Sequence, residues 1–171
     1  MGRDKALIEV EGVPLAKRVA GALTDGGAHP VLCIGGDQDA LEAIGLEWIP
    51  DDHPGEGPLG GFLTALAWAE GGFWDTVVVS ACDHPWLDGE TVESLLFGLL
   101  KAPLARPATG PDGRAPLFFA ANVAEVLPVV RDLFEGGERS MRWLGARLPV
   151  GTVHPIDLRR LRDVDTPDDL P

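Results

Sequence analysis

The feature that most constrains this chain is an alternation of short, unbroken apolar runs with segments whose apolar residues recur at helical spacing. Predominantly apolar runs occupy positions 31–34, 47–50 and 76–80, and weaker ones occupy 117–120 and 152–153. Apolar runs without polar alternation are typical of strands that are covered on both faces. The pattern therefore predicts five strands of a largely parallel sheet.

Helical segments lie between these runs. Pro58 suits the first turn of one helix, and Asp88 suits the N-cap position of another. The residues that would form the buried helix faces are Leu15, Val19, Ala22 and Leu23; Leu59, Leu63, Leu66 and Ala67; Val92, Leu95, Leu96 and Leu99; and Val123, Val126, Leu127 and Val130. Strand–helix alternation predicts an α/β fold, a Rossmann-like sandwich with a mostly parallel central sheet flanked by helices. We expect residues 1–171 to form one domain, because no linker or repeat divides them.

Charge and hydropathy exclude some classes of partner. A formal net charge of -13 argues against nucleic acid, which requires a basic surface. No apolar run approaches the roughly 20 residues that span a bilayer, so we expect no membrane association and a cytoplasmic protein. Cys33 and Cys82 fit no metal-ligand spacing, and we expect both to be small buried hydrophobes.

Arginine is concentrated in the last part of the chain. The six arginines there are Arg139, Arg142, Arg147, Arg159, Arg160 and Arg162. This asymmetry favours a local site for an anionic small molecule, although a solvated surface would have the same composition.

Two acidic residues follow predicted strands. Asp51 comes after one apolar run, and Asp83 comes after another through Ser80-Ala81-Cys82. Ligands of α/β proteins bind beyond the carboxyl ends of the strands, so the two acids are candidates for one shared pocket. Acids at strand ends are also common as turn and cap residues.

Four stretches, in this order, carry a resemblance to a known family. They are Met-Gly-Arg-Asp-Lys-Ala-Leu at 1–7 with Gly-Val-Pro-Leu at 12–15, Asp51 leading into Gly-Pro-Leu-Gly-Gly at 57–61, Cys-Asp-His-Pro-Trp-Leu at 82–87, and Asp-Val-Asp-Thr-Pro-Asp-Asp-Leu at 163–170. Pro-Leu-Phe at 116–118 and Gly-Glu-Arg at 137–139 are smaller echoes. Each motif is short, but the ordered set covers the whole chain and resembles the MobA-type molybdenum cofactor guanylyltransferases, which have a nucleotidyltransferase fold.

The resemblance implies an activity and its substrates. Such an enzyme transfers GMP from GTP to molybdopterin and releases pyrophosphate, with Mg²⁺ as cofactor. The resemblance is also compatible with transient contact between this protein and other proteins of cofactor biosynthesis. The implied catalytic residues are Asp83, which would hold the metal beside the nucleotide, and Lys5, whose ammonium would contact the triphosphate. A solvated surface lysine is the other interpretation of Lys5.

The remaining implied site residues divide between nucleotide and acceptor. Asp51 would contact the nucleotide, with Asp52 as the alternative. Gly57 and Pro58 would help to recognise guanine, although a purely structural turn would have the same sequence. The residues implied on the pterin side are Arg139, Asp163 and Asp165. The family more often carries Asn at the last two positions, so a role in assisting the metal stays open.

Two departures from the family pattern stand out. The family has a strand and a Leu-Ala-Gly-Gly turn ahead of the Met-Gly pair, and this sequence has neither before Met1. We expect either a start codon assigned too late or a truncated, weakened protein, and favour the first. Gly35-Gly36 stands where the family often has an Asn that contacts the nucleotide.

Three other functions compete with this interpretation. The first is transfer of CMP or another nucleotide to molybdopterin or to a different phosphorylated acceptor. The second is a non-catalytic regulatory domain of the phospho-acceptor type, although there the lysine comes late in the chain and here Lys5 comes first. The third is a catalytically inactive remnant.

Overall fold

The computed structural model describes residues 5–107, 116–153 and 156–164. Its main sheet has four strands in the order β5 (Thr76–Ser80), β7 (Phe118–Asn122), β6 (Leu104–Pro107) and β8 (Val150–Val153). A separate parallel pair is formed by β3 (Leu32–Ile34) and β4 (Glu47–Ile49), and β1 (Glu9–Val10) with β2 (Val13–Pro14) makes a small hairpin.

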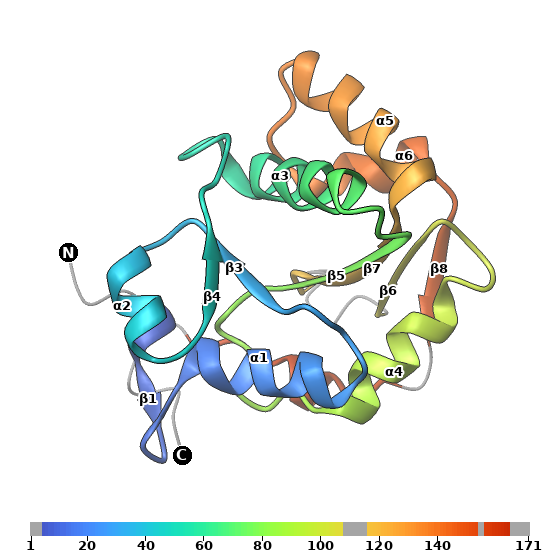
Figure 1. Ribbon diagram of the computed structural model, residues 1–171. Helices are drawn as coiled ribbons and strands as arrows, with labels where there is room; N and C mark the ends of the chain where they lie inside the picture. The colour runs from blue at the N-terminus through green and yellow to red at the C-terminus, as the bar shows by residue number, and fades with distance from the viewer. Residues whose placement is uncertain (1–4, 108–115, 154–155, 165–171) are drawn as a thin grey trace.

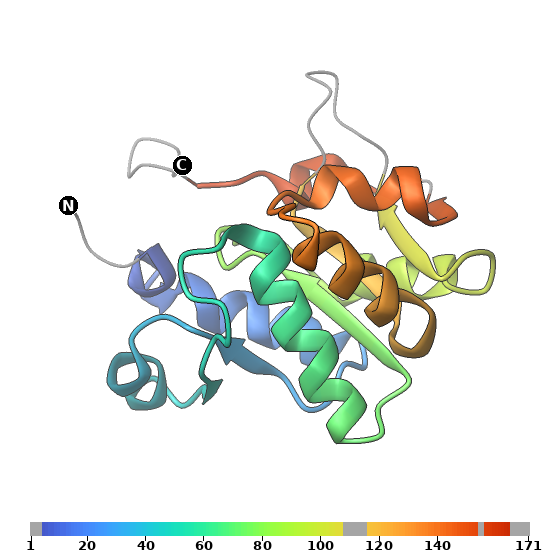
Figure 2. The ribbon, with the colours of Figure 1, turned by 90° about the horizontal axis from the view of Figure 1, so that it is seen from above.

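Helices cover both faces of the strands, as Figures 1 and 2 show. One layer contains α1 (Leu15–Asp25) and α4 (Gly89–Gly98), and the other contains α3 (Gly57–Gly71) and α5 (Val123–Glu135). The shorter helices are α2 (Gln38–Ala43), α6 (Leu144–Arg147), η1 (Lys5–Leu7), η2 (Met141–Trp143) and η3 (Leu158–Leu161).

The sheet separates two hydrophobic clusters, and β7 contributes to both. Phe119 and Ala121 pack with α3 and α5, whereas Phe118 and Ala120 pack with α1 and α4. All four side chains are buried, because successive residues of a strand point to opposite faces and both faces are covered here. The unbroken apolar run of the sequence therefore reflects a strand at the centre of a three-layer fold.

The α/β class is confirmed, but a single mostly parallel sheet is wrong. β7 runs antiparallel to both β5 and β6, and only β6 with β8 is a parallel pair in the main sheet. Among the described strands, β3 and β4 pair only with each other. An unbroken apolar run reports burial on two faces, which an antiparallel strand between two helix layers also has.

Several local signals were informative. The run 76–80 coincides with β5, Pro58 lies in the first turn of α3, and the Asp88 carboxylate accepts a hydrogen bond from the Thr91 backbone N–H as the N-cap of α4. The β1–β2 hairpin, α2 and β6 were not predicted from the sequence. Their segments are short, and β6 reads Leu-Ala-Arg-Pro without a β-branched residue.

The two cysteines are half-buried rather than fully buried, and both pack beside a small cluster that contains Ala6, Ala16 and Leu41. Within the described ranges, no helix combines the length and the apolar character that crossing a bilayer requires.

Candidate active site

The loop after β5 brings Asp83 to the side chain of Lys5. The Lys5 Nζ lies 3.8 Å from the Asp83 Oδ2, and the two side chains are 45% and 21% exposed. η1 positions the lysine, and the carboxyl end of β5 positions the acid. A cation from the first motif and a carboxylate from the third thus meet at an edge where α/β proteins bind their ligands.

His84 is buried directly behind this pair. Its Nδ1 lies 3.2 Å from the Ser80 Oγ, and its side chain is only 3% exposed. Burial lowers the pKa of His84, and the nearby carboxylates of Asp83 and Asp163 oppose that shift without cancelling it. The imidazole is therefore neutral near pH 7, and it supports the Asp83 loop without adding a positive charge to the site. The sequence analysis gave this residue no role.

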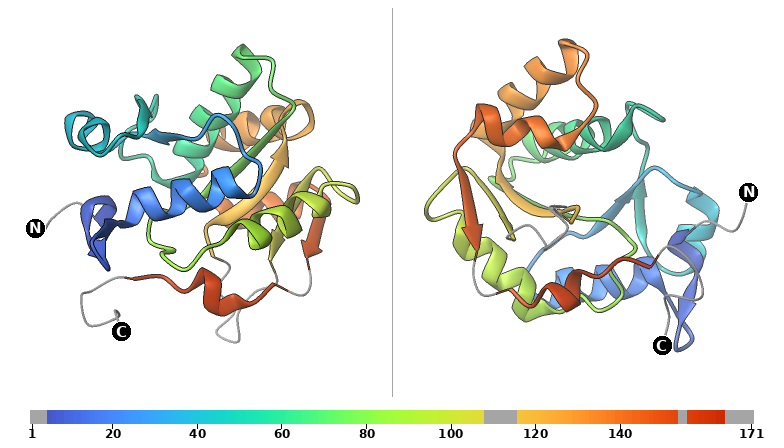
Figure 3. Two further views of the ribbon diagram at one scale, coloured as in Figure 1. Left: turned by 60° about the horizontal axis from the view of Figure 1, so that its bottom comes forward. Right: turned by 180° about the vertical axis from the view of Figure 1, so that it is seen from behind.

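The C-terminal segment closes against the same loop. The Val164 N–H donates to the Asp83 carbonyl oxygen at 3.0 Å, and Val164 is fully buried. Figure 3 shows the segment after η3 running towards the side of the molecule that carries η1. Asp163 therefore lies beside the Asp83 loop, while Asp165 lies outside the described residues.

A second group forms at the start of α3. Gly57 has a φ of +76°, and a Cβ at this position would lie 2.9 Å from the Arg139 carbonyl oxygen. That same oxygen accepts a hydrogen bond from the Leu59 N–H at 3.3 Å. Pro58 occupies the first turn between them. The turn therefore requires glycine at position 57 both for its backbone angle and for the close approach.

The Arg139 side chain is fixed against this turn. Its guanidinium lies 2.6 Å from the Glu56 carboxylate and 4.0 Å from the centroid of the Phe134 ring, and it donates to the Phe134 carbonyl oxygen at 2.9 Å. The structure thus brings a residue expected on the acceptor side into contact with the turn expected on the nucleotide side. Gly57, Pro58 and Arg139 form one group, and Lys5, Asp83 and Asp163 form another.

Asp51 is held in the turn after β4. Its Oδ1 accepts hydrogen bonds from the His53 N–H at 2.9 Å and from the Thr64 hydroxyl at 3.1 Å. The His53 ring lies 4.4 Å from the Phe134 ring, which links this turn to the group around Gly57. Asp51 thus has the structural role that strand-end acids often have, and one of its oxygens is already engaged. Thr64, which orients it from α3, was missed by the sequence analysis.

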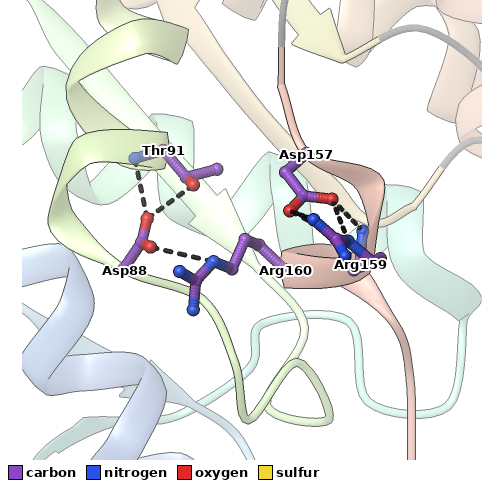
Figure 4. A network of polar contacts seen from close by, with 5 residues as sticks. All are labelled: Asp88, Thr91, Asp157, Arg159 and Arg160. Carbon is purple, nitrogen blue, oxygen red and sulfur yellow. Dashed lines mark hydrogen bonds and ion pairs between the residues drawn. The ribbon is translucent and has the colours of Figure 1, made fainter.

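The late arginines do not gather into one patch. Arg147 pairs with Asp132, and Arg142 lies over the Trp143 ring. Around η3, the guanidinium of Arg160 lies 3.1 Å from the Asp88 carboxylate, and Arg159 pairs with Asp157 (Figure 4). Arg162 lies 5.9 Å from the centroid of the Trp86 ring. Arg159, Arg160 and Arg162 line a cavity of about 450 Å³ together with Trp86, which lies three residues after Asp83.

The sequence matches a known protein family. Residues 1–150 match the MobA-like NTP transferase domain. The chain belongs to this family. Among curated relatives, the molybdenum cofactor guanylyltransferase of Rhodobacter capsulatus is 35% identical over 99% of this chain and 86% of its own length. The enzyme of the same name from Pseudomonas putida strain KT2440 is 31% identical over 99% of this chain and 87% of its own length.

Solved structures support the same fold. Molybdopterin-guanine dinucleotide biosynthesis protein A from Archaeoglobus fulgidus superposes with a TM-score of 0.72 at 22% identity, over 98% of this chain and 87% of that one. The 2-C-methyl-D-erythritol 4-phosphate cytidylyltransferase from Thermus thermophilus superposes with a TM-score of 0.75 at 17% identity, over 96% of this chain and 89% of that one. The chain therefore has the nucleotidyltransferase fold.

The residues of the first group suit magnesium in the manner usual for nucleotide enzymes. Mg²⁺ is commonly held by one or two carboxylates together with substrate phosphates. Asp83 offers such a carboxylate oxygen beside Lys5, and the Asp163 carboxylate lies near enough to His84 to act on its pKa. Within the described ranges, no three His, Cys, Asp or Glu side chains converge as a complete ligand set. With Asp83 as a ligand, phosphate oxygens of the substrate and water would complete the shell.

Proposed function

We propose that this nucleotidyltransferase transfers GMP from GTP to molybdopterin and releases pyrophosphate. The observation that carries the proposal is the pairing of Lys5 and Asp83 at the carboxyl edge of β5. The relatives named as molybdenum cofactor guanylyltransferases match nearly the whole chain, which supports the choice of reaction.

The chemistry joins two anions, so it requires positive charge and positioning rather than a covalent nucleophile. A terminal phosphate oxygen of molybdopterin forms a bond to the α-phosphorus of GTP, and the bond from that phosphorus to the bridging oxygen of pyrophosphate breaks. We assign Lys5 to the triphosphate, where its ammonium offsets the charge that builds on the leaving pyrophosphate. We assign Asp83 to the metal, since Mg²⁺ would neutralise phosphate charge there.

The other assignments are those that the resemblance implies, and they divide each of the two groups between nucleotide and acceptor. Gly57, Pro58 and Asp51 are assigned to the nucleotide. The resemblance of Gly-Pro-Leu-Gly-Gly at 57–61 to the family motif supports the assignment of Gly57 and Pro58. Arg139, Asp163 and Asp165 are assigned to the acceptor side.

Trp86 and Arg162 suit an aromatic anion such as a pterin phosphate, because guanidinium groups bind phosphate and an indole stacks on flat rings. Trp86 lies three residues after Asp83, and Arg162 directly precedes Asp163. This proximity favours the surface over Arg139 as the first contact of the acceptor.

A nucleotide profile tests the donor specificity. With Mg²⁺ present, GTP should raise the Tm of the protein more than CTP, ATP or UTP at the same concentration, because a ligand that binds only the folded state stabilises it. Transfer to molybdopterin should follow the same order. A larger shift and faster transfer with CTP would instead establish the second candidate, a cytidylyltransferase.

The arginines near Trp86 provide a separate test of the acceptor surface. Arg162→Ala should weaken molybdopterin binding by roughly tenfold or more and leave the GTP-induced Tm shift unchanged, since a charge-assisted bond is worth about 1.5–3 kcal/mol. Arg147→Ala, whose partner Asp132 lies on α5, is the matched control and should change neither. Equal losses for both ligands in the Arg162 variant would contradict this placement.

A further inference from the structure

The segment that follows η3 lies along the loop that carries Asp83. The loop spans 83–88, up to the start of α4, and the segment spans 160–164, which we call the strap. Their contacts, taken from the α4 end of the loop, are Arg160 with Asp88, Arg162 with Trp86, and Val164 with Asp83. Because the partners follow one another in opposite orders along the two segments, the strap runs antiparallel to the loop.

The contacts at the two ends of the strap set its register on the loop. At one end, the Val164 N–H donates to the Asp83 carbonyl oxygen at 3.0 Å, and Val164 is fully buried. At the other end, the Arg160 Nε lies 3.1 Å from the Asp88 Oδ2. The middle contact, at 5.9 Å from guanidinium to ring centroid, is close to the limit for a cation–π interaction. The strap therefore depends on its two ends, and one of them supports the backbone of the residue assigned to the metal.

Asp88 connects the strap to α4, because its two oxygens have different partners. The Oδ1 accepts hydrogen bonds from the Thr91 N–H at 3.0 Å and from the Thr91 hydroxyl at 2.6 Å, and so caps the helix. The Oδ2 faces the Arg160 guanidinium (Figure 4). α4 itself is fixed in the hydrophobic core by Val92 and Leu95, which are fully buried. Arg160 is thus held to a rigid element of the fold.

Arg159 lies beside Arg160 in the chain and differs from it in what its side chain joins. The Arg159 guanidinium lies 2.8 Å from the carboxylate of Asp157, which is the N-cap of η3. This pair therefore lies within one short helix and does not connect that helix to the loop. Both arginines line the same cavity, so they are alike in charge and in place. Of the two, Arg160 is the one that joins the strap to α4 (Figure 4).

We propose that Arg160 is a positioning residue for Asp83. Its ion pair with Asp88 fixes the register of the strap, and the strap holds the Asp83 backbone through Val164. An exposed ion pair adds little to the stability of a whole domain, but it can decide how often a short surface segment separates from its neighbours. Without the pair, the strap separates more often, and the Asp83 carboxylate is less often oriented for a metal. The inference rests on the proposed assignment of Asp83 to Mg²⁺.

Hydrogen exchange at the Val164 amide tests the link without any nucleotide. Arg160→Met keeps an unbranched stem and removes the charge, so the amide should exchange roughly threefold to fivefold faster, as expected for an exposed ion pair. Asp88→Asn should have the same effect at pH 7. The Asn Oδ1 still caps α4, but the NH₂ group in place of Oδ2 is a donor and cannot accept from a guanidinium. Arg159→Met is the matched control and should leave the rate unchanged.

A variant with both changes shows whether Arg160 acts through Asp88. If the two residues act as one pair, the Val164 amide of the double variant should exchange no faster than that of either single variant. Effects that multiply to roughly tenfold or more would mean that the residues act independently, and would overturn the proposal. An Arg160→Met rate equal to that of the parent protein, or matched by the Arg159→Met control, would overturn it as well.

A Mg²⁺ titration measures the consequence at the site. The Mg²⁺ concentration that gives half of the GTP-dependent Tm shift should rise roughly threefold to fivefold in both single variants and stay unchanged in Arg159→Met. Arg160→Met and Asp88→Asn alter the net charge in opposite directions, so a long-range field effect on Mg²⁺ would separate them, whereas positioning moves them together. A Mg²⁺ requirement equal to that of the parent protein in both variants would contradict the positioning of Asp83.

The two measurements also distinguish a failure of this link from a failure of the proposed function. If GTP binding by the parent protein did not depend on Mg²⁺, the assignment of Asp83 to the metal would be wrong. The Val164 exchange rates, measured without nucleotide, would still decide whether Arg160 holds the loop that carries Asp83.

Discussion

At the level of single residues, the Asp83 carboxylate lies between a lysine ammonium and a buried neutral imidazole. Asp83→Asn removes the charge and keeps the shape, so it should lower guanylyl transfer by roughly 10²–10⁴-fold and abolish the extra Tm shift that Mg²⁺ gives with GTP. Single-turnover transfer and thermal unfolding measure the two effects. Asp132→Asn on α5 is the isosteric control and should retain both. Full Mg²⁺-dependent GTP binding by the Asp83 variant would contradict its assignment to the metal.

Gly57 provides a second prediction at this level. Gly57→Ala should reduce the free energy of unfolding by about 1–2 kcal/mol through its left-handed φ alone, and by more because the new methyl would approach the Arg139 carbonyl oxygen. Gly61→Ala, inside the same helix and with open space around its Cβ, should raise stability by about 0.5–1 kcal/mol. Urea unfolding distinguishes the two variants. Equal effects would mean that the turn does not depend on the close approach.

The location of the candidate site can be predicted from the sequence more readily than the contacts between the residues within that site. Strand-end acids can be located from an apolar run, since the carboxyl edge follows from the strand direction. The Lys5–Asp83 pair, by contrast, joins residues 78 positions apart, and the contact between Arg139 and Gly57 joins two separate motifs. Such pairings depend on how the helices pack, and no local pattern encodes them. His84 and Thr64 were missed for the same reason, because their roles are set by what surrounds them.

At the level of secondary-structure elements, the start of α4 has a pH-dependent cap. Burial raises the pKa of Asp88, but hydrogen bonds from Thr91 and the charge of Arg160 outweigh that effect and leave the pKa lowered. The folded pKa thus lies below the unfolded value. The stabilisation is therefore fully present above roughly pH 4 and is lost as the pH falls through the folded pKa.

Two substitutions of Asp88 distinguish the hydrogen bonding of the N-cap from the effect of its negative charge. Asp88→Ala should lower the free energy of unfolding by about 1 kcal/mol at pH 7. Asp88→Asn keeps a good N-cap but cannot titrate, so it should cost less at pH 7 and should remove this part of the acid sensitivity. Urea unfolding between pH 7 and pH 3 checks both. If the free energy of unfolding of the Asn variant fell with pH as it does in the parent protein, other carboxylates would account for the loss of stability in acid.

Elements with strong periodicity could be predicted, and short ones could not. α1 and α5 carry clear apolar faces, and β5 is an unbroken β-branched run. β6, in contrast, is a strand because β7 and β8 pair with it on both sides, although its own sequence lacks β propensity. Tertiary pairing overrides local preference at such positions.

At the level of the whole molecule, the strands should differ in how readily they open. β7 is paired on both edges and buried on both faces, whereas β3 and β4 pair only with each other among the described strands. In the 171-residue protein, the amides that pair β3 with β4 should therefore exchange through a local opening of lower free energy than the β7 amides. Native-state exchange at increasing urea measures this order. Coincident opening of both ladders would show one cooperative unit instead.

The hydrogen bond from Val164 to Asp83 has a consequence for proteolysis. Arg159, Arg160 and Arg162 are exposed just ahead of the residue that supports the Asp83 loop. Brief tryptic cleavage after Arg162 would release Val164 and remove its hydrogen bond to the Asp83 loop. The rest of the protein would stay folded, because its two hydrophobic clusters consist of earlier residues. Activity should then disappear while most of the circular dichroism signal survives. A protein purified from a protease-rich host could thus be well folded and still inert.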